Sequence, residues 1–568
     1  MKKKSFMLSV LILAVGGLIA KIIGAVYRIP LTYVLGAEGL GLYQLVFPLY
    51  SLLIILSSSG VPTAIAKMVS ERAAKGKVRE INQILGVSLV VLSVFGLIGS
   101  LLIFFGADAF AGLQGNASSG LGFRAIAPAV FLVAVLSSFR GYFQGLSQMG
   151  HTAVSQILEQ VAKLVLGLIF AYMFVGNGLM YGAFGAVLGV TISEVVAVIY
   201  MVFAWLFSRK KLAEKLALAQ AQERGNYEDE HAFTNSAKSK EAKNCGNSAE
   251  TEASQHLQNL LSPPVETCAS KKTLTKELVK TALPITFASI IIPLTFLVDS
   301  LLVVNLLKSI GYSTEQATIL YGLHSGVANS VINMPVVITL SIATALVPAI
   351  CFQVSSGKKD VSVTAAKAIR VALLLALPCM LGLMLLSPSI LEFLYDASLR
   401  VGTIDEPSVA ALILRTGSFS VLFLAMLQVF TSILQSLNLA RIPVYSLLVA
   451  SVVKIGLSVA LIMVPSLNIL GATIANIACF FVAALINFIF LKKRLDVRLS
   501  VGKCLVPVTI ASLSMIAVIL GLNWALSSQS AYISLPITLV SAALVYSSML
   551  FVLGGADDFR ELFKRPKA

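Results

Sequence analysis

Long apolar windows recur along almost the whole chain and are separated by short polar segments. A transmembrane helix needs about 20 mostly apolar residues, and each window reaches that length. The pattern therefore predicts an all-α, polytopic membrane protein with 14 transmembrane helices. We expect these helices near 6–35, 41–66, 81–106, 123–146, 152–175, 180–207, 278–307, 318–351, 363–387, 409–436, 443–464, 469–491, 503–526 and 531–553.

The composition agrees with this interpretation, because only 12% of the 568 residues are charged, 57% are hydrophobic and the mean hydropathy is +0.89. A soluble protein usually carries about 25% charged residues. The composition therefore disfavours a soluble enzyme, a nucleic-acid-binding protein and a disordered chain, despite the net charge of +16. The apolar run after Met1 and three lysines is longer than the apolar part of a signal peptide, and we interpret it as an uncleaved first helix.

Most of the positive charge indicates how the chain is oriented in the membrane. With the N-terminus inside, 34 Lys and Arg residues fall on the inner side and four on the outer side. Basic residues concentrate in cytoplasmic loops. We therefore predict a multi-pass protein of the cell membrane with both termini in the cytoplasm.

One long polar segment, 208–277, interrupts the series of apolar windows and is rich in Gln, Ser, Asn, Lys and Glu. This composition is typical of a linker that does not build a core, and docking of a partner protein is the alternative. We predict an N-lobe of six helices over 1–207, a cytoplasmic linker over 208–277, and a C-lobe of six helices over 278–491. Helices 13 and 14 and a basic cytoplasmic tail follow over 492–568.

The two lobes are repeats of one another. A shift of 291 positions aligns 124–164 with the second half without a gap. Both halves start on the same side of the membrane, so the repeat is parallel. This architecture is typical of transporters whose site lies between the lobes. The polar matches are Arg124 with Arg415, Gln144 with Gln435, Ser155 with Ser446, and Lys163 with Lys454.

Charged residues inside the membrane windows are the candidates for a functional site. Each costs about 2.5–3.5 kcal/mol at the centre of a helix, and such residues tend to be paired or to line a wet cavity. Lys21 and Arg28 lie seven residues apart and so share one helix face. Glu159 and Lys163 have the i, i+4 spacing of an ion pair. The basic candidates are Lys21, Arg28, Arg140, Lys163 and Lys454, with Arg124 and Arg415 at helix ends, and the acidic candidates are Glu159, Glu194 and Asp299.

The excess of basic candidates favours an anionic substrate, because Arg and Lys recognise phosphate by charge and hydrogen bonds. We expect the basic residues to bind substrate, and the acidic residues to provide any coupling to Na⁺ or H⁺. The six Cys and four His show no metal-ligand spacing, and no glycine-rich nucleotide loop is present. We therefore expect a protein that is not an enzyme, holds no metal or cofactor, and uses an ion gradient or the membrane potential.

Four segments carry a resemblance to a known family: Ala20–Arg28, Gly60–Lys67, Arg140–Met149 and Thr344–Ala349. The most specific is Arg140–Met149, which reads RGYFQGLSQM. Together these segments resemble the stage V sporulation protein B and polysaccharide biosynthesis branch of the MOP exporter superfamily. The MurJ lipid II flippases and the MATE exporters are more distant relatives. The resemblance covers nearly the whole chain, and the polar linker is the part least like the family.

The resemblance implies a flippase that moves a polyprenyl-pyrophosphate-linked saccharide, with the peptidoglycan precursor lipid II as the expected cargo, by alternating access. In the MurJ relatives, basic residues of helix 1 line the central cavity, and Lys21 and Arg28 match them. The basic residues of helices 2 and 8 have no counterpart here. The resemblance also implies that helices 13 and 14 form a groove for the lipid tail. Expected partners are the lipid-linked saccharide, membrane lipids and cell-wall synthesis proteins, and no nucleic acid.

Two other functions remain open from the sequence. The first is a MATE-like, ion-coupled exporter of small solutes. The second is a non-transporting membrane scaffold that uses the 208–277 linker to dock cell-wall or sporulation enzymes.

Overall fold

The structure is a computed structural model that describes residues 3–58, 60–74, 77–208, 270–355, 361–399, 404–437, 439–495 and 501–554. Within these ranges, 12 helices are long and apolar enough to cross a membrane. One of them, Val15–Ala73, has 59 residues, which is enough for two crossings, and the 39-residue helix α9 comes in addition. The chain is therefore an all-α, polytopic membrane protein, consistent with 14 crossings. Most of the predicted linker, 209–269, lies outside the described residues.

The first half of the chain forms one group of helices, which we call the N-lobe. The long helix α9 begins the second half. The N-lobe helices are α1 (Lys3–Val26), α2 (Arg28–Ser58), α3 (Val61–Ala74), α4 (Val78–Leu113), the short η1 (Ala117–Ser119), α5 (Gly120–Gly145), α6 (Met149–Val175) and a helix over Leu179–Ser208.

The second half forms the C-lobe and two further helices. Its helices are α9 (Lys271–Ser309), α10 (Thr314–Tyr321), the π-helix η3 (Gly322–Ala328), α11 (Asn329–Ser355), α12 (Val361–Leu385), α13 (Ser387–Tyr395), η4 (Asp396–Ser398), α14 (Glu406–Gly417), α15 (Phe419–Ser436), α16 (Arg441–Ile462), α17 (Ile469–Leu495), α18 (Val501–Ala525) and α19 (Ala531–Val552).

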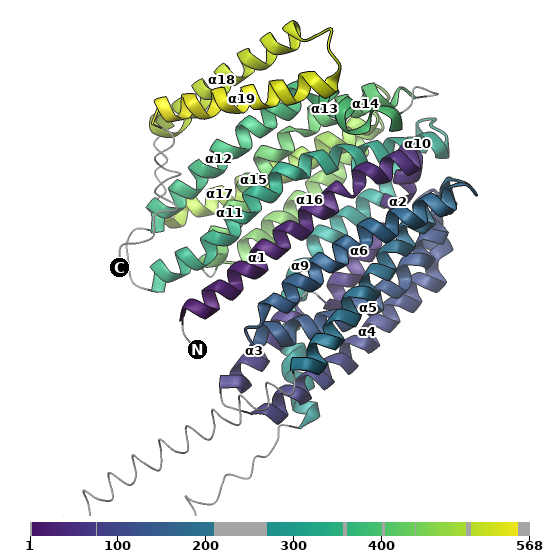
Figure 1. Cartoon of the computed structure of the whole chain (residues 1–568), viewed down its shortest axis with the longest axis vertical. Coiled ribbons are helices and arrows are strands. Elements are labelled where there is room, and N and C mark those ends of the chain that lie inside the picture. Colours follow the sequence, from purple (N-terminus) through teal and green to yellow (C-terminus); the bar gives the residue numbers. More distant parts are fainter. Residues whose placement is uncertain are drawn as a thin grey trace, which may run out of the picture.

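The two lobes lie side by side, with α1 along their boundary (Figure 1). Helix α1 packs against α6 of the N-lobe and α11 of the C-lobe, whereas α9 packs against α2 of the N-lobe and α16 of the C-lobe. Helices α18 and α19 pack against each other, and α18 also packs against α12 at the edge of the C-lobe (Figure 1). One helix of each lobe thus contacts both lobes, which places the space between the lobes at the centre of the fold.

The first predicted helix, 6–35, is broken in the structure. Regular α-helix ends at Val26 and starts again at Arg28, so that Tyr27 lies at the break. A second break follows at Gly36, whose φ of 65° is a conformation that glycine adopts without a Cβ clash. The two breaks separate a short segment that carries Arg28 from the helices on either side.

At one end of the molecule, the lobes meet through closely spaced backbones of α2, α10 and η3. A Cβ atom on Gly41 would lie 2.3 Å from the carbonyl oxygen of Thr318, and one on Gly322 would lie 2.1 Å from that of Ala37. Only glycine permits this approach. Asn116 Nδ2 also donates a hydrogen bond of 2.8 Å to Thr318 Oγ1. This end, which we call the α10 end, is closed by backbone and uncharged side-chain contacts and by a 3.0 Å hydrogen bond from Lys308 Nζ to the carbonyl oxygen of Gly115.

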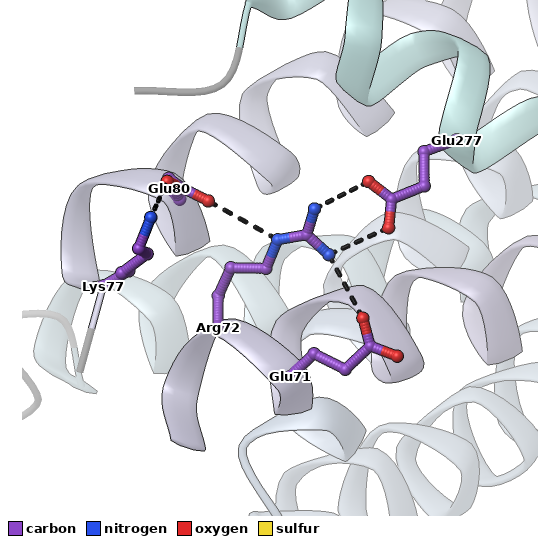
Figure 2. A network of polar contacts seen from close by, with 5 residues as sticks. All are labelled: Glu71, Arg72, Lys77, Glu80 and Glu277. Carbon is purple, nitrogen blue, oxygen red and sulfur yellow. Dashed lines mark hydrogen bonds and ion pairs between the residues drawn. The ribbon is translucent and has the colours of Figure 1, made fainter. Parts of the chain in front are cut away.

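At the other end, which we call the α3 end, a cluster of charged residues joins the lobes (Figure 2). Arg72 of α3 donates two hydrogen bonds, of 2.9 and 2.6 Å, to the carboxylate of Glu277 at the start of α9. Its Nε atom lies 3.5 Å from Glu80, which also accepts from Lys77 at 2.9 Å. The sequence identifies Arg72 only as one of many residues that indicate orientation, whereas the structure makes it a bidentate bridge between lobes.

Candidate functional site

A polar cavity of about 260 Å³ lies between the two lobes. Its walls come from α2 of the N-lobe and from α9, α10, η3, α11 and α17 of the C-lobe. It therefore lies where a rocking motion of the lobes would open and close it. The polar residues that line it include Arg28, Gln44, His324, Asn329, Asn333 and Asn476.

Arg28 reaches this cavity because it is the first residue of α2, directly after the break at Tyr27. Its Nη1 atom donates a hydrogen bond of 2.9 Å to Ser330 Oγ of α11. A guanidinium group has five N–H donors, so further donors remain for a ligand. Among the described residues, no carboxylate lies within ion-pair distance of Arg28. The structure thus places this predicted site residue in a cavity with unused hydrogen-bond donors.

Lys163 of α6 lies beside the same cavity wall. Its Nζ atom is 5.5 Å from the ring centre of Tyr27 and 5.4 Å from that of Phe47, and Phe47 lines the cavity. Cation–π contacts of this kind hold an ammonium group without neutralising its charge. The lysine therefore keeps its positive charge close to the cavity.

The predicted ion pair between Glu159 and Lys163 is wrong. Glu159 instead accepts a 2.8 Å hydrogen bond from Arg140 Nη2 and a 2.9 Å bond from Gln160 Nε2. Arg140 Nε also donates to Ser155 Oγ at 3.0 Å. The planar guanidinium group can bond Glu159 and Ser155 together, which explains why arginine replaces the lysine as partner. Arg140 is thereby half of a structural pair and does not line the cavity.

Lys454 and Asp299 also form a buried pair. Lys454 Nζ donates to Asp299 Oδ2, and the side chain of Lys454 is only 2% exposed. Asp299 lines the inter-lobe cavity. A buried ion pair keeps both charges compensated inside the protein. The predicted substrate role of Lys454 and the predicted coupling role of Asp299 therefore compete with this contact.

Glu194 is the acidic candidate with the fewest contacts. Its Oε1 atom accepts a hydrogen bond of 3.4 Å from Tyr50 Oη. Its Oε2 atom is buried without a hydrogen-bond partner. Of the three acidic candidates, it alone has no basic partner within ion-pair distance among the described residues.

Three further predicted residues lie away from the cavity. Lys21 is exposed on α1, and Arg124 forms a 2.5 Å ion pair with Asp108. Arg415 lines a separate cavity of about 590 Å³ together with Glu392. Although Lys21 and Arg28 are two turns apart in sequence, the break at Tyr27 ends the regular helix between them. The repeated pair Arg124 and Arg415 does not contribute to the space between the lobes.

The sequence analysis missed the uncharged part of the cavity. Gln44 of α2 is 6% exposed, and its Nε2 atom is buried without a hydrogen-bond partner. His324 Nδ1 lies 3.1 Å from Thr473 Oγ1, and its Nε2 atom lies 3.3 Å from Asn476 Nδ2. Uncharged polar residues are common in membrane windows and do not stand out by composition. The i, i+4 spacing of Asn329 and Asn333 is a signal that could have indicated a polar helix face.

A second, apolar cavity of about 620 Å³ lies between α12, α18 and α19. Leu374, Leu383, Met515 and Leu539 line it. Tyr546 of α19 donates a hydrogen bond of 2.7 Å to the carbonyl oxygen of Leu374, which fixes α19 against α12. An apolar space bounded by the last two helices agrees with the lipid-tail groove that the resemblance implies.

Two family descriptions match this chain. Residues 7–221 match the family described as polysaccharide biosynthesis protein. Residues 254–541 match the family described as lipid II flippase MurJ, and this match covers half of the chain. The two matches together extend over both lobes.

A curated relative agrees with these matches. Stage V sporulation protein B of Bacillus subtilis (strain 168) is 30% identical over 351 residues, which are 62% of this chain and 59% of that protein. The chain thus spans about three fifths of that relative's length.

Two solved structures are similar in fold. Lipid II flippase MurJ in an inward closed conformation has a TM-score of 0.60 at 13% identity, covering 98% of this chain and all of that one. A MATE transporter of the MOP superfamily in an inward-facing conformation has a TM-score of 0.62 at 15% identity, covering 84% and 94%. At these identities the likeness shows the fold alone. The match to the family described as lipid II flippase MurJ covers half of the chain, so the chain belongs to that family, and its first half also matches the family described as polysaccharide biosynthesis protein.

Proposed function

We propose that this protein flips a polyprenyl-pyrophosphate-linked saccharide, with lipid II as the expected cargo, from the inner to the outer leaflet of the bacterial cytoplasmic membrane. The observation that supports this most is the set of unused hydrogen-bond donors in the inter-lobe cavity. Arg28 has no carboxylate within ion-pair distance among the described residues, and Gln44 of the cavity wall has a buried Nε2 atom without a hydrogen-bond partner. A pyrophosphate group would supply the hydrogen-bond acceptors and the negative charge that these donors lack within the cavity.

The charge balance around the cavity also favours an anion. Ion pairs compensate Lys454 and Arg140, whereas Arg28 and Lys163 have no acidic partner within ion-pair distance among the described residues. Arginine can bind a phosphate through two parallel hydrogen bonds, and lysine binds it as a point charge. In this proposal Arg28 contacts the pyrophosphate directly. Lys163, which lies on the far side of the Phe47 ring from the cavity, attracts it electrostatically without contact.

The apolar cavity between α12, α18 and α19 provides a place for the prenyl tail. The tail is a hydrocarbon, and an apolar cavity can hold it without burying an unpaired polar group. The head group would then move between the lobes while the tail stays in apolar surroundings.

The volume of the polar cavity indicates that the lobes must separate during transport. Pockets for drug-sized ligands have about 300–1,000 Å³, and a lipid-linked saccharide head group is larger than such a ligand. The 260 Å³ between the lobes holds less than that. Alternating access by rocking of the two lobes is therefore part of the proposal.

The energy for outward movement has two candidate sources. An inside-negative membrane potential contributes about 2.3 kcal/mol per charge per 100 mV to the outward movement of an anion. Of the acidic residues, Glu194 is the one that we assign to coupling with H⁺ or Na⁺, because Arg140 and Lys454 already pair with the other two. Flipping measured with and without an imposed potential separates these sources.

The test is a lipid II flipping assay in proteoliposomes. Arg28→Ala should lower the flipping rate about tenfold or more, since a hydrogen bond to a charged group contributes about 1.5–3 kcal/mol. Arg28→Lys keeps the charge and should retain part of the rate. Arg124→Ala is the matched control, because Arg124 is an exposed arginine outside the cavity. Flipping by Arg28→Ala at the native rate would remove the basis of the proposal.

The same proteoliposomes distinguish the other functions. A MATE-like exporter would transport small cations and leave lipid II in place. A scaffold would lose its cellular function when 209–269 is deleted, whereas a flippase without this segment should still flip lipid in vesicles.

A further inference from the structure

One hydrogen bond inside the polar cavity joins the two lobes. Arg28 of α2 donates from Nη1 to Ser330 Oγ of α11, at 2.9 Å. Ser330 is only 1% exposed, and its own hydroxyl group donates to the carbonyl oxygen of Gly326 in the π-helix η3. Since a hydroxyl group has one proton, Ser330 acts toward Arg28 only as an acceptor. The contact therefore holds the guanidinium group to the C-lobe through a neutral oxygen atom.

This contact is weak compared with the bond that an anionic ligand would form. The bond to Ser330 has one charged partner, whereas arginine binds phosphate through two parallel hydrogen bonds in which both partners are charged. A pyrophosphate group in the cavity would therefore displace Ser330 from the guanidinium group. The displacement would also remove a link between the lobes.

We propose that the hydrogen bond from Arg28 to Ser330 is a tether that holds the lobes together in the empty protein and that an anionic head group breaks on binding. Ser330 is then a positioning residue, which acts on the substrate only through Arg28. The inference rests on the proposed function, since it takes Arg28 as the binding residue for the pyrophosphate. It adds a physical link between substrate binding and lobe movement.

The tether makes an unusual prediction for Ser330→Ala. Because the substrate no longer competes with Ser330, the variant should bind inorganic pyrophosphate more tightly than the native protein. A hydrogen bond to a charged group contributes about 1.5–3 kcal/mol, so the dissociation constant should fall about tenfold or more. A residue that merely supported Arg28 would give the opposite result on removal.

The binding experiment is titration of the detergent-solubilised full chain with inorganic pyrophosphate by calorimetry. Ser446→Ala is the matched control, because Ser446 is as buried as Ser330 but lies outside the cavity and donates to the carbonyl oxygen of Pro443 on its own helix. It should leave the dissociation constant unchanged. Arg28→Ala should abolish measurable binding.

The second measurement follows the lobes themselves. Val161 and Val452 occupy equivalent positions of the repeat and are both exposed, at 42% and 71%. Spin labels on V161C and V452C, in a chain whose native cysteines are replaced and which still binds pyrophosphate, report the distance between lobes. Pyrophosphate should change this distance distribution in the native background. In Ser330→Ala the distribution should already be shifted without ligand.

A second inter-lobe contact provides the control for lobe movement. Glu277→Gln weakens the bridge from Arg72 at the α3 end, far from Arg28 in the chain. It should shift the distance distribution without ligand, and because lobe separation and binding are linked, it should change the dissociation constant less than Ser330→Ala, which removes a direct competitor of the ligand.

The outcomes separate the tether from the proposed function. Tighter binding by Ser330→Ala with unchanged binding by Ser446→Ala supports the tether. Unchanged or weaker binding by Ser330→Ala, together with loss of binding by Arg28→Ala, overturns the tether and leaves the binding site in place. Native binding by Arg28→Ala overturns both.

Discussion

Lys163 and Lys454 occupy equivalent positions of the two lobes, yet their surroundings differ. Lys454 donates to Asp299 and is buried. Lys163 lies over the rings of Tyr27 and Phe47 and has no carboxylate within ion-pair distance among the described residues. The same residue at the same place in the repeat is thus compensated in one lobe and uncompensated in the other.

The reason lies in the neighbouring positions of the repeat. Shifted by 291, Arg140 and Glu159 of the N-lobe fall on Thr431 and Ala450 of the C-lobe. The N-lobe therefore holds an extra ion pair that the C-lobe lacks, and this pair takes up the glutamate nearest to Lys163 in sequence. Pairing between helices therefore decides which of the two lysines is left without an ion-pair partner.

The largest effect on stability should come from breaking the ion pair between Lys454 and Asp299. Lys454→Met leaves Asp299 without its basic partner, and breaking a buried pair from one side costs about 3–5 kcal/mol. We expect a lower thermal unfolding temperature in detergent. The double variant Lys454→Met with Asp299→Leu should recover most of the loss, because apolar replacement of a whole pair is often neutral. Equal stability of single and double variants would contradict the burial of an unpaired charge.

The next effect should come from changing the N-lobe pair into its C-lobe equivalents. Arg140→Thr leaves Glu159 with Gln160 as its remaining partner, and losing a bond to a charged group costs about 1.5–3 kcal/mol. Adding Glu159→Ala completes the copy of the C-lobe and should restore part of the stability. Unfolding in denaturant measures both steps. If the double variant is less stable than the single one, the pair is not the source of the loss.

A smaller effect on stability should accompany Lys163→Met. The substitution removes cation–π contacts worth about 0.5–2 kcal/mol but leaves no buried carboxylate behind. We expect a small fall in unfolding temperature together with a marked fall in lipid flipping. Lys454→Met at a temperature where it remains folded provides the comparison. A loss of stability as large as that of Lys454→Met would remove the distinction between the two lysines.

The smallest effect should come from Arg124→Ala. The ion pair of Arg124 with Asp108 is 39% and 73% exposed, and exposed pairs contribute about 0–1 kcal/mol. Stability in detergent and the flipping rate should both stay close to native values. A clear fall in flipping would instead return Arg124 to the substrate-binding residues that the repeat suggested.

The helical membrane fold could be predicted from the sequence because apolar windows depend only on local composition. The predicted window 6–35 contains the interruption at Tyr27, and the break at Gly36 follows directly after it. Arg28 was among the predicted residues, but its place in the cavity depends on the first of these breaks. The pattern of apolar residues does not contain that information.

The partners of the charged residues were harder to predict than the residues themselves. The spacing of Glu159 and Lys163 favoured a local pair, whereas the guanidinium group of Arg140 comes from the preceding helix and bonds Glu159 and Ser155 together. The partner of Lys454 lies 155 positions away, on α9. Such contacts follow from helix packing, which one sequence does not reveal.

The difference between the two ends of the molecule makes the balance between its conformations sensitive to ionic strength. The Debye length falls from about 30 Å at 0.01 M salt to about 8 Å at 0.15 M, so salt weakens exposed charge pairs and leaves uncharged contacts unchanged. The bridge between Arg72 and Glu277 is partly exposed, at 15% and 34%, whereas Gly41 and Gly322 meet through backbone atoms. We therefore expect raised salt concentration to weaken the bridge at the α3 end, by less than it would weaken a fully exposed pair, and to leave the backbone contacts of Gly41 and Gly322 unchanged. The salt concentration of the buffer can thus be used to test whether the Arg72–Glu277 bridge affects the side of the membrane to which the cavity opens.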